Sequence, residues 1–167
     1  MINKKTAILN RLSEDRAEYV GFCRFVNNEA VRWEDIIQED IQLTNERSQG
    51  QHVLVLNDTT ELNYQSHINF LNKKDSDLGP TGNNKDIGFF LHPCLVLNAA
   101  TGVGLGFSHV KIWNRKWDKK DTVARNYKTQ KIEEKESYRW IESGIESKQN
   151  LSQAKQITVI ADRESDI

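Results

Sequence analysis

Two short apolar runs, each closed by an aspartate, constrain this chain more than any other feature of its sequence. The first run is V-L-V-L-N at residues 53–57, followed by Asp58; the second is I-T-V-I-A at residues 157–161, followed by Asp162. Such runs are typical of buried β-strands. A carboxylate at the carboxyl end of a central strand lies where α/β folds place their chemistry. One such aspartate alone is usually a turn former or a helix cap, but two of them, if their strands are neighbours, would form a divalent-cation site.

The hydrophobic periodicity of the rest of the chain predicts an α/β fold with a mixed sheet preceded by two helices. The two helices are expected at residues 11–27 and 29–46. Strands follow at residues 89–97 and 104–114, and a helix at residues 132–148 precedes the second aspartate. Three sequential strands favour an antiparallel meander, and the intervening helix favours a right-handed crossover to a parallel strand. That crossover would bring Asp58 and Asp162 side by side.

The helical spacing also predicts which faces of the helices are buried. For residues 11–27 the expected inner face is Tyr19, Phe22, Cys23 and Val26. For residues 132–148 it is Ser137, Trp140, Ile141, Gly144 and Ile145. Pro93 predicts a bulge or an edge position in its strand, because proline cannot donate to a ladder.

Composition describes an ordinary polar protein of 167 residues with 37% hydrophobic and 28% charged residues. The sequence shows neither a secretory signal nor an apolar run long enough to cross a bilayer, so no membrane partner is expected. Cys23 and Cys94 lie in unrelated apolar contexts, which favours buried free thiols and a reducing cytoplasm.

The net charge of −1 is unevenly distributed along the chain. Between residues 111 and 131, eight basic residues stand against two acidic ones, so this stretch carries +6 and the remainder −7. Such asymmetry permits a local surface for phosphate groups, although a solvated loop of mixed charge is the plainer interpretation. The candidate DNA-binding residues are Lys111, Arg115, Lys116, Lys119, Lys120, Arg125, Lys128 and Lys131.

Three ordered motifs resemble those of DDE transposases of the cut-and-paste insertion-sequence-four group. They are N-D-T-T-E-L-N-Y at residues 57–64, E-E-K-E-S-Y-R-W at residues 133–140 and A-D-R-E-S-D-I at residues 161–167. Two weaker matches, F-C-R-F-V-N-N at residues 22–28 and L-G-P at residues 78–80, occur in the family's order. The likeness therefore covers essentially the whole chain.

This resemblance implies a ribonuclease H-like fold and DNA transposition by metal-dependent strand cleavage and transfer. Asp58 and Asp162 would be catalytic metal ligands for Mg²⁺ or Mn²⁺, in the two-metal site of the full-length family. His92, Arg163 and Glu164 would line the site. The implied partners are transposon ends and target DNA, with a dimer in the full-length family. The implied location is the bacterial cytoplasm, in association with the nucleoid when the protein is on DNA.

The chain departs from the family pattern in one important respect. The family's third carboxylate lies on a later helix, and nothing after Ile167 supplies it. We therefore expect an N-terminal helical remnant of the end-recognition region at residues 1–48 and a partial catalytic core, incomplete at the C-terminus, at residues 50–167. This fragment is expected to be inactive alone. The alternatives are a non-catalytic DNA- or transposase-binding remnant that acts as an inhibitor and, ranked last, a related metal-dependent nuclease.

Overall fold

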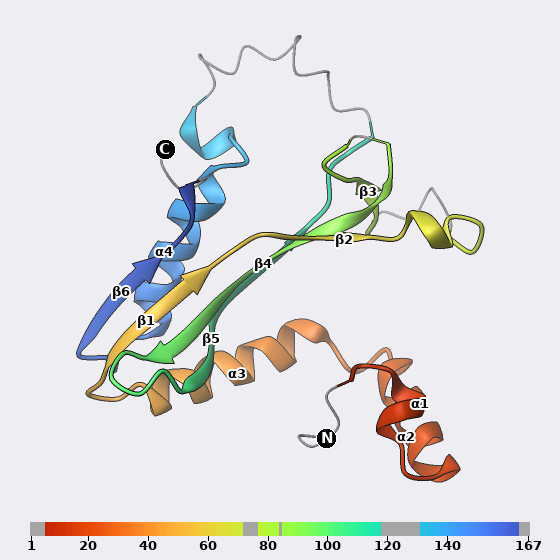
Figure 1. Cartoon of the computed structure of the whole chain (residues 1–167), viewed down its shortest axis with the longest axis horizontal. Helices are drawn as coiled ribbons and strands as arrows, with labels where there is room; N and C mark the ends of the chain where they lie inside the picture. The colour runs from red at the N-terminus through yellow and green to blue at the C-terminus, as the bar shows by residue number, and fades with distance from the viewer. Residues whose placement is uncertain (1–5, 72–76, 84, 118–130, 164–167) are drawn as a thin grey trace. The chain divides into compact units, whose positions relative to one another are not determined.

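The computed structural model describes residues 6–71, 77–83, 85–117 and 131–163 (Figure 1). The chain divides into two compact units, Met1–Gln38 and Glu39–Ile167. The division predicted after residue 48 falls at the end of helix α3 (Trp33–Arg47), whereas the two units meet inside that helix. The C-terminal half of α3 belongs to the second unit because it bonds to strand β5 (Gly104–Trp113): Arg47 donates to the Leu105 carbonyl at 2.8 Å.

The first unit contains two short helices, α1 (Leu9–Leu12) and α2 (Arg16–Val26). A single helix was predicted at residues 11–27, but Asp15 adopts an extended conformation and caps α2 by accepting the Glu18 N–H at 2.8 Å. None of the described residues of α1 and α2 is buried. The predicted inner face of α2 is therefore wrong: Val26 is 65% exposed, and Cys23 is half-buried. Regular apolar spacing buries a face only where another element covers it.

The second unit is built on a mixed sheet, and its strands within the described residues are β1 (His52–Asn57), β2 (Thr60–Asn63), β3 (Gly79–Pro80), β4 (Ile87–Asn98), β5 (Gly104–Trp113) and β6 (Gln156–Ile160). The main order is β2-β4-β1-β6, and β5 and β3 also pair with β4. β1 is antiparallel to β4 and parallel to β6. The predicted α/β class, antiparallel meander and parallel final strand are confirmed.

Strand β4 is the long central strand of the sheet, and the ladder along one of its sides is interrupted. β1 pairs with it as far as Asn57↔Cys94, and β2 resumes in the same register at Thr60↔Leu91. Asp58 and Thr59 are the two residues between these strands, opposite His92 and Pro93. The interruption, together with a register shift after Cys94 on the β5 side, accommodates Pro93 inside the sheet. The predicted bulge is therefore found, and the edge position is not.

Helix α4 (Tyr138–Asn150) packs on one face of the sheet, against β1, β4 and β5 (Figure 1). Its C-cap residue Leu151 joins a core cluster whose other buried members are Val53, Val55, Cys94 and Val96. The short 3₁₀ helices η1 (Gln65–His67) and η3 (Ile132–Glu134) complete the described elements.

The inner face of α4 differs from the predicted one. Its buried residues are Trp140, Ser143 and Ser147, whereas Ile141 and Ile145 are exposed. The two serines are buried because their hydroxyls have partners: Ser147 Oγ lies 2.9 Å from Ser108 Oγ on β5. The helix is therefore oriented by the hydrogen bonds of its buried serines, and not by the spacing of its apolar residues.

Among the helices of the described residues, none combines the length and apolar character that a bilayer crossing requires.

Candidate functional site

The two strand-end aspartates lie at the same end of neighbouring parallel strands. β1 and β6 pair residue by residue from His52↔Gln156 to Leu56↔Ile160. Asp58 and Asp162 each follow this last pair by two positions, so they occupy equivalent places in the register. Neighbouring strands are about 4.8 Å apart, which puts the two aspartates within reach of a common ligand.

Both aspartates line one pocket of about 500 Å³. Its apolar wall comes from β1, β4, β5 and β6, and the described lining residues are Leu56, Asn57, Pro93, Leu95, Phe107, Ile160 and Ala161 beside the two aspartates. Asp58 and Asp162 are exposed. Asp58 Oδ1 accepts the N–H of Thr59 at 2.7 Å, which holds this carboxylate close to the backbone between β1 and β2.

The chemistry of these two side chains suits a hard divalent cation. Mg²⁺ prefers oxygen ligands, is commonly held by one or two carboxylates, and keeps water at its remaining positions. Within the described residues there is no cluster of three or more His, Cys, Asp or Glu side chains that could enclose a metal. The Asp58–Asp162 pair therefore fits an open, partly hydrated ion and does not form a closed structural metal site.

The family resemblance also implied that His92, Arg163 and Glu164 line the site, and the two of them that the structure describes do not share one position relative to the aspartate pocket. His92 is fully buried and is not among the described residues that line the aspartate pocket. Burial, followed by repulsion from Arg139, lowers the pKa of His92 to about 4, so its imidazole is neutral. Arg163 is exposed one residue after Asp162, and Glu164 lies outside the described residues.

The candidate DNA-binding residues divide into three groups. Lys111 forms an ion pair with Glu142 of α4, and Arg115 forms one with Glu136 at 2.6 Å. Lys116 and Lys131 are exposed. The remaining four, Lys119, Lys120, Arg125 and Lys128, lie outside the described residues. Exposed cations are better placed than paired ones to contact a phosphate backbone, because a paired cation must first give up its partner.

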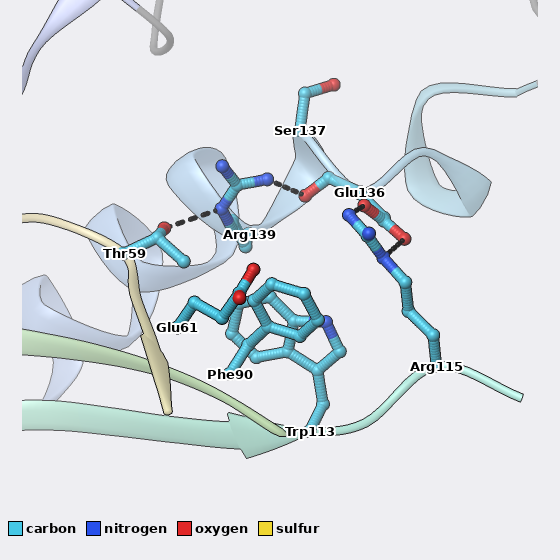
Figure 2. A pocket seen from close by; sticks show the side chains of 8 residues that line it. All are labelled: Thr59, Glu61, Phe90, Trp113, Arg115, Glu136, Ser137 and Arg139. Atoms are coloured by element: carbon cyan, nitrogen blue, oxygen red, sulfur yellow. Dashed lines mark hydrogen bonds and ion pairs between the residues drawn. The ribbon is translucent and has the colours of Figure 1, made fainter. Parts of the chain in front are cut away.

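A second pocket, which the sequence did not lead us to expect, is lined by Thr59, the residue that follows Asp58 (Figure 2). It has a volume of about 520 Å³, and its lining residues are Thr59, Glu61, Phe90, Trp113, Arg115, Glu136, Ser137 and Arg139. Phe90 and Trp113 stack with ring centroids 5.3 Å apart, and the Arg115 guanidinium lies 4.6 Å from the Phe90 centroid. We call this the arginine pocket.

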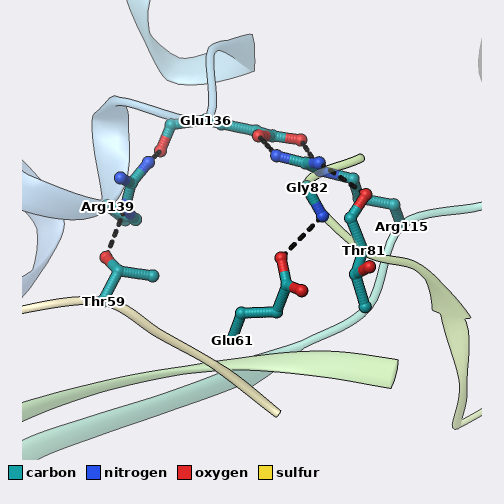
Figure 3. Close-up of polar contacts among 7 residues, drawn as sticks. All are labelled: Thr59, Glu61, Thr81, Gly82, Arg115, Glu136 and Arg139. Atoms are coloured by element: carbon teal, nitrogen blue, oxygen red, sulfur yellow. Dashed lines mark hydrogen bonds and ion pairs between the residues drawn. The ribbon is translucent and has the colours of Figure 1, made fainter. Parts of the chain in front are cut away.

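The charged groups of the arginine pocket hold one another in place (Figure 3). Arg115 donates to both oxygens of Glu136, at 2.9 and 2.6 Å, and to the Thr81 carbonyl at 3.2 Å. Glu61 accepts the Gly82 N–H at 2.7 Å. Arg139 donates to Thr59 Oγ1 and to the Glu136 carbonyl, both at 2.8 Å. Glu136 and Arg139 belong to the E-K-E-S-Y-R-W motif, which was the available signal for this pocket.

A comparison of the chain with protein-family models finds no match.

Proposed function

We propose that this chain carries two metal-binding aspartates of a DDE-type DNA transposase core with a ribonuclease H-like fold. The observation that supports the proposal most strongly is the parallel register of β1 and β6, which brings Asp58 and Asp162 to one end of the sheet and into one pocket. The three ordered motifs of the sequence add support, because the first and last of them contain these aspartates.

The proposed roles follow from the chemistry of the two side chains. Asp58 and Asp162 would hold Mg²⁺ or Mn²⁺ by their carboxylate oxygens. A bound ion would supply Lewis-acid stabilisation of the attacking and leaving oxygens of a phosphodiester. The chain itself contributes two exposed carboxylates beyond the carboxyl ends of β1 and β6, and an apolar wall on the same pocket.

Metal binding is the direct test. Isothermal titration calorimetry with MnCl₂ should detect binding to the wild-type chain. Asp58→Asn and Asp162→Asn should each lower the affinity at least about tenfold, because amides are weaker ligands than carboxylates. Glu61→Gln is the matched control: Glu61 is a nearby acid whose carboxylate accepts the Gly82 N–H in the arginine pocket. Equal affinity in all four proteins would contradict the proposal.

Strand transfer is a separate question from metal binding. The family uses three carboxylates, whereas the described residues bring two together at this pocket, so we expect no joining by this chain alone. Incubation with labelled transposon ends and Mn²⁺ measures joining directly. Robust strand transfer would show that the two aspartates are sufficient.

A second candidate function, DNA-backbone binding without catalysis, is favoured by the +6 charge of residues 111–131 and by the exposure of Lys116 and Lys131. Such binding should weaken steeply with salt, because phosphate contacts release counterions. A double substitution of Lys116 and Lys131 to Gln should reduce the slope of log affinity against log salt by about two. If the chain has no measurable affinity for duplex DNA at low salt, this candidate function is excluded.

A further inference from the structure

The residues on either side of Asp58 are both tied to α4 through their side chains. Asn57 Nδ2 donates to Ser143 Oγ at 3.0 Å, and Thr59 Oγ1 accepts from Arg139 Nε at 2.8 Å. Asp58 itself lines the aspartate pocket, whose described lining includes no residue of α4. The alternation of neighbouring side chains therefore directs Asp58 away from the helix while its two neighbours are bound to it.

The direction of each hydrogen bond in this network can be assigned. Ser143 Oγ donates its single proton to the Trp140 carbonyl at 3.0 Å, so it must accept from His92 Nε2 at 3.3 Å. His92 then carries its proton on Nε2 and has a lone pair on Nδ1. That lone pair accepts the Thr59 hydroxyl proton at 2.9 Å. The Thr59 oxygen remains available to accept from Arg139.

This assignment requires a neutral imidazole, and the low pKa of buried His92 agrees with it. The Thr59 hydroxyl is thus bonded on both sides, to β4 through His92 and to α4 through Arg139. Arg139 is itself restrained: it donates to the Glu136 carbonyl at 2.8 Å (Figure 2). Its guanidinium lies 5.2 Å from the Trp140 centroid and 6.0 Å from the Trp113 centroid.

We propose that Thr59 and Arg139 are positioning residues, which fix the two-residue break between β1 and β2 so that the Asp58 carboxylate faces Asp162. The backbone ladder with β4 is interrupted at Asp58 and Thr59, so the side-chain bonds of Thr59 replace the missing restraint. Asp58 Oδ1 accepts the backbone N–H of Thr59, which couples the position of Thr59 directly to the carboxylate. The consequence for metal affinity rests on the function proposed above, whereas the restraint of the backbone at residues 58 and 59 does not.

The test compares Thr59→Val, which removes the hydroxyl at nearly constant shape, with Thr59→Ser, which retains it. Thr60→Val is the control, because Thr60 is an exposed neighbouring threonine at the start of β2. We expect Thr59→Val to lower Mn²⁺ affinity about tenfold, Thr59→Ser to restore most of it, and Thr60→Val to leave it unchanged. Arg139→Lys, which loses the Nε–H, should resemble Thr59→Val.

A second measurement does not depend on metal. Nitrogen-15 NMR of the imidazole should show the Nε2–H tautomer for His92, and amide exchange at residue 59 should accelerate at least about tenfold in Thr59→Val. If the wild-type chain binds no Mn²⁺, the proposed function fails. The His92 tautomer and the amide exchange rate at residue 59 then still show whether Thr59 restrains the backbone. Unchanged exchange at residue 59, or unchanged Mn²⁺ affinity of Thr59→Val in a metal-binding wild type, would overturn the positioning role.

Discussion

Asp58 and Thr59 are adjacent in the chain, yet they line two pockets that differ in charge: one is acidic and the other is balanced. On the Asp58 side, two exposed carboxylates of like charge line one pocket. On the Thr59 side, the pocket is lined by both arginines and glutamates, and Arg115 forms a bidentate ion pair with Glu136. Opposite charges that satisfy one another hold a fold together, whereas like charges on neighbouring strands repel until a cation joins them. In the function proposed above, the arginine pocket therefore holds the break between β1 and β2 in place, and the aspartate pocket would bind the cation.

The largest expected effect comes from removing the central cation of the arginine pocket. Arg139→Met should lower the free energy of unfolding by about 3 kcal/mol, because the bonds to Thr59 and to the Glu136 carbonyl and the contacts with two indole rings are lost together. Urea unfolding measures this. The control is Lys116→Met, an exposed cation, for which the change should stay within about 0.5 kcal/mol. If both variants lost the same free energy of unfolding, the hydrogen-bonded Arg139 would contribute no more to stability than the exposed Lys116.

A smaller effect is expected from the pH. Burial, followed by the charge of Arg139, lowers the pKa of His92 from 6.5 to about 4. Between these values the unfolded chain binds the extra proton and the folded chain does not. The free energy of unfolding should therefore fall by up to about 2 kcal/mol as the pH drops from 6.5 to 4, and the contribution is fully present above pH 6.5. His92→Gln should lack this component in urea titrations across the range; identical pH profiles would contradict the assignment.

The Arg115–Glu136 pair should contribute less than Arg139, since both side chains keep part of their hydration. Their side chains are 20% and 31% exposed. Glu136→Gln should cost about 1 kcal/mol of the free energy of unfolding, and a double-mutant cycle with Arg115→Gln should give a positive coupling energy. This coupling should fall only modestly in 0.5 M salt. A coupling energy of zero would show that the ion pair contributes nothing to the free energy of unfolding.

The smallest change in stability is expected at the aspartates, and it has the opposite sign. Asp58→Asn should leave the free energy of unfolding unchanged or raise it by about 0.5 kcal/mol without metal, because one of two like charges is removed. In the presence of MnCl₂ the wild type should gain stability and the variant should not, since a ligand that binds only the folded state stabilises it. Thermal melts with and without Mn²⁺ measure both differences.

Much of the architecture could be predicted from local sequence patterns. The apolar runs at residues 53–57 and 157–161 both form strands, and the helical segment between them is long enough for a crossover. These features led to the parallel pairing of β1 and β6. Burial was predicted for both runs; it holds for Val53 and Val55 of β1, whereas β6 is mostly exposed. The turn that begins at Asn98 also has a local basis: Asn98 Oδ1 accepts the N–H groups of Ala100 and Thr101, and Gly102 has φ of 70°.

The features that escaped prediction depend on partners far apart in the chain. Ile141 and Ile145 have the apolar spacing of an inner face, yet Ser143 and Ser147 are buried instead. The reason is that Asn57 and His92, 86 and 51 residues away, offer hydrogen bonds to Ser143. The Thr59 network is hidden for the same reason, because its bond to Arg139 spans 80 residues. Periodicity reports apolar burial, whereas long-range polar pairing becomes visible only in three dimensions.

The most direct measurement is a double-mutant cycle of Mn²⁺ affinity over Asp58→Asn, Asp162→Asn and the combined variant. If the two carboxylates hold one ion, either single substitution removes most of the binding, and the combined variant loses little more than each single one. Additive losses, or a single substitution that leaves the affinity of the wild type intact, would mean that the two strand ends do not share a cation.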